Sequence, residues 1–172
     1  MPPVKWFDRQ FTFQIPAELH AHLTTRLRGT PARLEELTRH LSQPVLATKL
    51  GETWSIQENV GHLLDLEPLW ESRVDDFLNG KEVLTEADLK NRKTHEAHHN
   101  KTPPGILLKS FRQARERLVD RLEGLPAEDF KKCSRHPRLG TPMRLIDMLE
   151  FIAEHDDHHL ARIWELRRQQ GT

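Results

Sequence analysis

The stretch that decides the fold is EFIAEHDDHHLARIWELRR, residues 150–168. Its apolar residues recur at the three- and four-residue spacing of an amphipathic helix. Yet residues 155–159, HDDHH, are poor helix formers and are costly to bury. The interruption indicates that one turn of this helix serves a purpose other than core packing.

A helical wheel places part of this polar turn on the buried face. The apolar centre of the helix consists of Leu145, Leu149, Ile152 and Ile163. His155 and His159 lie on the shoulder of this stripe, and their spacing of four residues brings the imidazoles to within about 5–6 Å of each other, close enough to bind one metal ion. Asp156 also points inward, whereas Asp157 and His158 point away.

Helical patterns cover most of the remaining chain. Four segments carry them: residues 16–43, 53–80, 104–125 and 141–169. A weak alternating pattern typical of a strand is found only over residues 6–15. Long connectors at residues 81–103 and 126–142 leave room for crossovers. The sequence therefore predicts an all-α fold, a four-helix bundle with long connectors, as one domain over residues 1–172.

Local signals predict where the helices break and begin. Gly29 predicts a break within the first segment. Ser55 with Glu58 three residues later predicts a capping box at the start of the second. Thr141 followed by Pro142 predicts the N-cap and first position of the last helix.

Composition narrows the classes of function. Lys plus Arg and Asp plus Glu each number 26, so the formal net charge is zero, which argues against a nucleic-acid or anionic-membrane partner. Neither a signal-peptide pattern nor a bilayer-spanning apolar run is present, so we expect a cytoplasmic protein. Cys133 is the only cysteine, and a metal site would therefore use the histidines, of which there are 11, and carboxylates.

A third candidate ligand lies on the second helical segment. His62 lies at the edge of its apolar stripe, on the same face as Leu66 and Leu69. With His155 and His159 it would make a three-histidine site with open coordination positions. The alternative is that His62 is a hydrogen-bonded shoulder residue and the histidine pair is a polar part of the core.

Two carboxylates and a histidine-rich connector could extend this site. Glu67 and Asp156 point inward and could orient ligand imidazoles, act as a base, or pair with an arginine. Three histidines in the connector, His95, His98 and His99, could also contribute, but we expect them to lie in a solvated loop.

The motifs resemble those of a known family. WSIQENVGHLLDLEPLW, residues 54–70, followed by HPRLGTPMRLIDMLEFIAEHDDHHLARI, residues 136–163, is similar to the DinB-like superfamily, which includes the YfiT-type proteins. The resemblance covers about residues 15–168. It implies a four-helix bundle, often a homodimer, with one divalent ion such as zinc, nickel or iron held by His62, His155 and His159.

The resemblance also implies a chemistry. Members with a known activity mainly use a low-molecular-weight thiol, such as bacillithiol or mycothiol. The leading hypothesis is therefore a metal-dependent, thiol-dependent S-transferase, in which the ion presents the thiolate to a small electrophilic substrate. One alternative is a metal-dependent hydrolase of a small ester or amide. The other is a non-catalytic, stress-related binding or scaffold protein.

Overall fold

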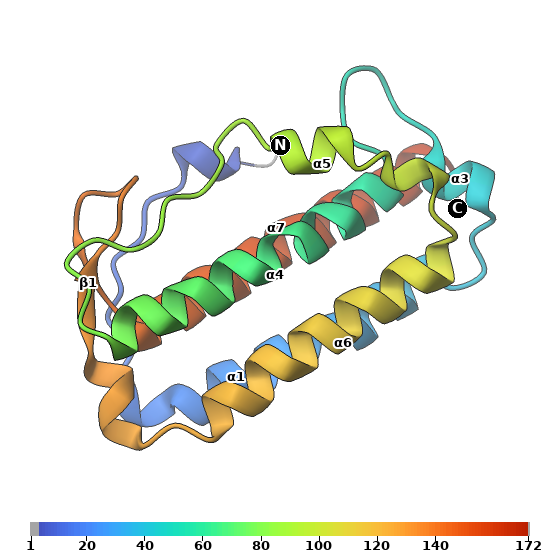
Figure 1. The fold of residues 1–172 in the computed structure, drawn as a ribbon. Coiled ribbons are helices and arrows are strands. Elements are labelled where there is room, and N and C mark those ends of the chain that lie inside the picture. Colours follow the sequence, from blue (N-terminus) through green and yellow to red (C-terminus); the bar gives the residue numbers. More distant parts are fainter. Residues whose placement is uncertain (1–3, 172) are drawn as a thin grey trace.

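Long helices in four rows form the framework of the structure (Figure 1). The structure is a computed structural model that describes residues 4–171. One row is a broken helix made of α1 and α2, and the others are α4, α6 and α7. Their bounds are His20–Arg28, Thr30–Thr38, Ile56–Leu78, Pro104–Glu123 and Leu145–Gln169. The predicted all-α four-helix bundle is confirmed.

Short elements connect these rows. They are η1 (Trp6–Asp8), η2 (Ala17–Leu19), α3 (Gln43–Ala47), α5 (Arg92–Glu96), η3 (His99–Lys101), η4 (Ala127–Lys131), β1 (Cys133–Arg135) and β2 (Pro142–Arg144). The two strands form an antiparallel pair in which Ser134 faces Met143. The strand-like pattern over residues 6–15 gives no strand, because η1 and irregular backbone occupy it.

The predicted helix signals at Gly29 and Ser55 are confirmed. Gly29 separates α1 from α2. The Ser55 hydroxyl accepts the Glu58 backbone N–H at 3.0 Å, and the Glu58 carboxylate accepts the Ser55 backbone N–H at 2.8 Å. This reciprocal capping box fixes the start of α4, and therefore the rotation at which His62 is presented.

The predicted start of the last helix is wrong. Pro142 lies in β2, and α7 begins only at Leu145. The Asp147 carboxylate accepts the Arg144 backbone N–H at 2.8 Å and pairs with the Arg144 side chain. Residues 142–144 are extended because they pair with β1, a tertiary contact that overrides the local Thr-Pro signal.

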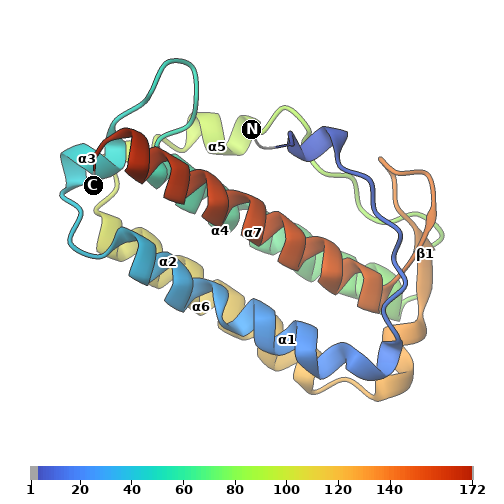
Figure 2. The same cartoon turned by 180° about the vertical axis from the view of Figure 1, so that it is seen from behind.

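The bundle has a crossover topology. The colours of Figures 1 and 2 show that α4 and α6 run in the same direction, so residues 79–103 return along the length of α4. This connector contains α5 and η3, both of which contact α4. It lies on the side of α4 and α7 that faces away from α1 and α6.

The apolar core fills the space between the four rows. Fully buried members include Leu63, Val74, Phe111, Leu118, Leu149 and Ile163. The bundle interior also holds one charged cluster, centred on Arg115 of α6. Among the described residues, no helix is long and apolar enough to cross a membrane.

Candidate metal centre

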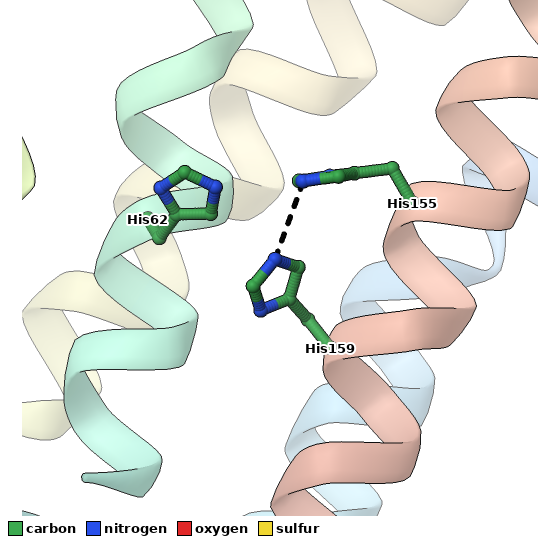
Figure 3. A group of neighbouring side chains, drawn as sticks. All are labelled: His62, His155 and His159. Atoms are coloured by element: carbon green, nitrogen blue, oxygen red, sulfur yellow. Dashed lines mark hydrogen bonds between the residues drawn. The ribbon is translucent and has the colours of Figure 1, made fainter. Parts of the chain in front are cut away.

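Three histidines from two helices converge at the seam between α4 and α7 (Figure 3). His62 comes from α4, and His155 and His159 come from successive turns of α7. Each offers one ring nitrogen, and these nitrogens lie within 4.8 Å of one another. The Nε2 atoms of His155 and His159 are 3.2 Å apart. The structure thus brings together the three residues that the sequence predicts as ligands.

Burial keeps these imidazoles neutral. All three residues are no more than 6% exposed. Burial lowers the pKa of His62 to about 4, although Asp65 opposes the shift. Burial, followed by the neighbouring histidines, holds the pKa of His155 and of His159 well below the usual range. Neutral imidazoles are the form that donates a lone pair to a metal ion.

The geometry fits a single transition-metal ion. Nitrogens that share one ion at about 2.1 Å each lie roughly 3.0–3.4 Å apart, which matches the separation of the two α7 nitrogens. Within the described residues, the buried Nδ1 of His155 has no hydrogen-bond partner, and the Trp6 ring contacts this imidazole edge-on at 4.8 Å between centroids.

Hydrogen bonds direct the Nε2 lone pairs of His62 and His159 toward the centre. The Nδ1 atom of His159 lies 2.8 Å from the Asn59 side-chain oxygen, which can only accept. The Nδ1 atom of His62 lies 3.1 Å from the Thr94 hydroxyl, which itself donates to Asp65 at 2.9 Å. Both Nδ1 atoms therefore carry the proton, which leaves each Nε2 free to bind an ion.

His99 is also part of this arrangement, contrary to the expectation of a solvated loop. It is 6% exposed, and its Nε2 lies 2.8 Å from the Asp65 carboxylate. Its ring packs on Gly61 so closely that a Cβ atom there would lie 2.2 Å away. His95 and His98 are exposed, as predicted. The loop prediction fails for His99 because α4 offers both a carboxylate and a glycine gap.

Glu67 and Asp156 lie in the bundle interior, where both pair with Arg115. The Arg115 guanidinium is 2.7 Å from Glu67 and also pairs with Asp156. The Thr30 hydroxyl donates to Asp156 at 2.7 Å. Burial raises the pKa of Glu67 despite the Arg115 charge. The sequence allowed these carboxylates to orient an imidazole, act as a base or pair with an arginine. Their contacts in the described part of the chain match the pairing with arginine.

A cavity of about 690 Å³ opens directly onto the three histidines. Its apolar wall includes Trp6, Trp54, Leu66, Leu69, Trp70 and Phe151. Trp54 packs on His62 at 4.7 Å between ring centroids. Residues 86–89 form another part of the wall, so the long polar connector folds over the site. The cavity can hold a small organic molecule against the histidines.

Comparison with known proteins agrees with this architecture. The sequence profile of the DinB superfamily matches residues 26–163, a segment that contains all three histidines. The chain belongs to the DinB superfamily. This assignment confirms the resemblance found in the sequence motifs.

Two relatives of this DinB-superfamily chain are named as metal-dependent hydrolases. It is 28% identical over 147 residues to a Bacillus pumilus protein named "Putative metal-dependent hydrolase", covering 82% of this chain and 81% of the relative. It is 25% identical over 159 residues to YfiT of Bacillus subtilis, which carries the same name, covering 84% and 82%.

Solved structures share the fold. The Bacillus subtilis YfiT structure, described as an unusual four-helix bundle topology, matches with a TM-score of 0.80 at 24% identity, over 95% of this chain and 94% of that one. A mycothiol-dependent maleylpyruvate isomerase matches with a TM-score of 0.67 at 14% identity, over 88% and 62%.

Sequence reasoning missed the residues that orient the histidines. Asn59 and Asp65 lie three residues before and after His62, so helical spacing could have identified them. Thr94 carries no such signal, because its position depends on the path of the connector.

Proposed function

We propose that this DinB-superfamily protein is a metal-dependent enzyme that acts on a small molecule. In this proposal, His62, His155 and His159 hold one divalent transition-metal ion, for which zinc, nickel and iron are all suitable. The observation that carries it is the convergence of three buried, neutral imidazoles at the edge of a 690 Å³ cavity. A structural metal would have no need of such a cavity.

The protein side chains have separable roles around that ion. When bound, the ion supplies a positive charge that lowers the pKa of a thiol or water in an open position. Asn59 and Thr94 hold the ring nitrogens of His159 and His62 in the correct tautomer. Trp54 and Trp70 form part of the apolar wall of the cavity beside the histidines.

Thiol-dependent transfer is the reaction we favour. A metal-stabilised thiolate attacks an electrophile without a general base, whereas activation of water is usually assisted by one. The two inward carboxylates predicted as possible bases, Glu67 and Asp156, are paired with Arg115 inside the bundle and do not line the cavity. The cavity of about 690 Å³ is of the size that holds a small organic molecule.

Hydrolysis of a small ester or amide is the second candidate. The names of the curated relatives support it. So does His158, which the helical wheel placed away from the core but which lines the cavity beside His159, at 5.2 Å between ring centroids. Burial lowers the pKa of His158, so its imidazole is unprotonated near neutral pH, the form that a general base requires.

Metal analysis with paired activity assays tests these proposals. We expect about one equivalent of a transition metal in the parent protein and its loss in His159→Ala, with His95→Ala as the exposed-histidine control. The loaded parent should conjugate bacillithiol or mycothiol to a model electrophile such as monochlorobimane. Turnover of activated esters without thiol would instead establish the hydrolase. A parent that binds no metal after reconstitution would refute both and favour the binding or scaffold role.

A further inference from the structure

A second polar cluster lines the same cavity away from the three histidines. It consists of Arg73 from α4 and of His136 and Arg138 from the loop between β1 and β2. Arg73 is 1% exposed and His136 is 3% exposed. The Trp70 ring separates this cluster from the metal centre, because its centroid is 5.5 Å from the Arg73 guanidinium and 6.2 Å from the His155 ring centroid.

The hydrogen bonds of His136 leave two donors facing each other. Its Nδ1 atom accepts the backbone N–H groups of Arg138 and Leu139, both at 3.2 Å. A neutral imidazole that accepts at Nδ1 carries its proton on Nε2. That Nε2 lies 3.3 Å from Nη1 of Arg73, which can only donate. Two N–H groups this close can both be satisfied by one shared acceptor.

Arg138 adds a third set of donors. Its guanidinium lies over the rings of Phe7 and Phe151, at 5.3 and 5.9 Å from the ring centroids. Within the described residues, its buried Nη2 atom has no hydrogen-bond partner. A buried N–H group without an acceptor is costly unless a ligand completes it.

Protein carboxylates do not neutralise this cluster. Neither Arg73 nor Arg138 forms a salt bridge with any residue between 4 and 171. The nearby Asp76 accepts from Lys81 and from the Thr85 backbone.

Two acidic residues also line the cavity, but they belong to the exposed connector. Glu86 and Asp88 are both exposed, and Asp88 accepts from the Arg92 side chain and backbone. The buried part of the cluster is therefore positively charged.

We propose that Arg73, His136 and Arg138 bind the carboxylate or phosphate group of a small organic acid. The donors of Arg73 and His136 would share one oxyanion oxygen, and Arg138 would bind a second. The apolar body of the acid would lie along Trp70 and Phe151, with its far end directed to the histidine centre. That this acid is the substrate or the thiol cofactor rests on the proposed function, whereas the anion site itself does not depend on the metal.

Calorimetric titration tests the site separately from catalysis. The metal-loaded and the chelator-stripped full-length protein are each titrated with benzoate, phenyl phosphate and the neutral isostere benzamide. We expect at least one of the two acids to bind at least about tenfold more tightly than benzamide, because hydrogen bonds to a charged acceptor are stronger than those to a neutral amide.

Variants identify the residues involved. Arg138→Gln should weaken acid binding at least about tenfold. Arg162→Gln is the matched control, because Arg162 lines the same cavity but pairs with Glu165 at 2.8 Å, and binding should be unchanged. Arg138 is partly exposed, so its substitution leaves the core intact.

The outcomes separate the two proposals. Equal binding of acids and benzamide, equal effects of the two variants, or no binding of either acid would overturn the anion site. Acid binding by stripped protein, combined with no metal uptake and no turnover, would retain the anion site and refute the proposed enzyme. Metal-dependent turnover that accepts only uncharged substrates and is unaffected by Arg138→Gln would retain the proposed enzyme and refute the anion site.

Discussion

At the scale of single residues, the site depends on groups that hold the histidines rather than on the histidines alone. Asn59 and Thr94 each accept from one Nδ1–H, and Asp65 holds both Thr94 and His99. A ligand imidazole without such a partner would sample both tautomers and lose part of its affinity for the ion.

Asn59→Leu should weaken metal binding by about 10- to 100-fold, because it removes the acceptor that fixes the tautomer of His159. Competition with a chromogenic chelator measures this affinity. Asn59→Asp keeps an oxygen in place and should retain most of the affinity. If both variants bind as tightly as the parent, Asn59 does not orient His159.

Gly61→Ala should destabilise the protein by about 1–3 kcal/mol, because the new methyl group would overlap the His99 ring. Ordinarily an alanine within a helix is favourable. Gly105→Ala on α6, where no atom lies within 4 Å of the new Cβ, is the matched control and should be neutral or stabilising. Urea unfolding measures the change in the free energy of unfolding for both variants.

The double variant Gly61→Ala with His99→Ala tests the cause. It should recover part of the stability, since the overlap is then removed. A double variant that is as unstable as the sum of the single variants would show that the strain lies elsewhere.

At the scale of elements, Arg115 ties the four rows together. It pairs with Glu67 of α4 and Asp156 of α7, and it donates to the Leu27 carbonyl of α1 at 3.4 Å. The two carboxylates raise its pKa, outweighing the effect of burial. This cluster fixes the rotation of α4 and α7, and so the direction in which their histidines point.

Arg115→Met should lower the free energy of unfolding by about 3–5 kcal/mol, because two buried carboxylates would lose their partner. Arg112→Met, one turn earlier on the same helix, removes a partly exposed pair with Glu35 and should cost less than about 1 kcal/mol. Similar losses for the two variants in urea unfolding would contradict a central role for the Arg115 cluster.

The elements also show how far the sequence could be interpreted. Local chemistry determines three features that the sequence predicted. Gly29 indicated the break before α2, and Ser55 indicated the start of α4. The helical wheel of residues 145–163 gave the inward face of α7. The β1–β2 pair was missed because each strand has only three residues, too few for a periodic pattern. Its presence moved the first residue of α7 from Pro142, as predicted, to Leu145.

The same limit applies to the site. A wheel gives the direction of Glu67 and Asp156 but not the neighbour on a third helix, so Arg115 could not be assigned. His99 and Thr94 were unassignable because a polar connector lacks the periodicity that would place it. His62, His155 and His159 could be predicted because helical spacing and one complementary histidine suffice.

At the scale of the whole molecule, the cavity joins four separate parts of the chain. The helices supply the histidines, residues 4–7 and 86–89 supply covering walls, and the β1–β2 loop supplies His136 and Arg138. The expected homodimer and the small-molecule partner stay predictions.

Stability should fall as the pH is lowered, in part because of His136. Burial, with Arg73 and Arg138 nearby, lowers the pKa of His136 to about 3. Between the ordinary value of about 6.5 and 3, the unfolded chain binds a proton that the folded chain does not. The stability is therefore present in full above pH 6.5 and decreases below it, by at most about 1.4 kcal/mol per pH unit for this group.

Urea unfolding at pH 7, 6 and 5 measures this slope. His136→Gln should reduce it, whereas His22→Gln, at an exposed position on α1, should not. An unchanged slope in His136→Gln would show that other groups account for the acid sensitivity.

The crossover connector has a consequence for how the chain folds. Side chains of α4 hold it at successive points: Asp76 and Arg73 at Thr85, Asp65 at Thr94 and His99, and Gln57 at His99 and Thr102. A parallel helix pair ordinarily requires one long, entropically unfavourable loop closure. Here the closure is divided into short steps along one helix. The same connector both covers the cavity and brings the chain to the start of α6. Gly61→Ala disturbs one of these contacts, the packing of His99 on α4. We therefore expect this variant to refold more slowly than the parent in stopped-flow experiments.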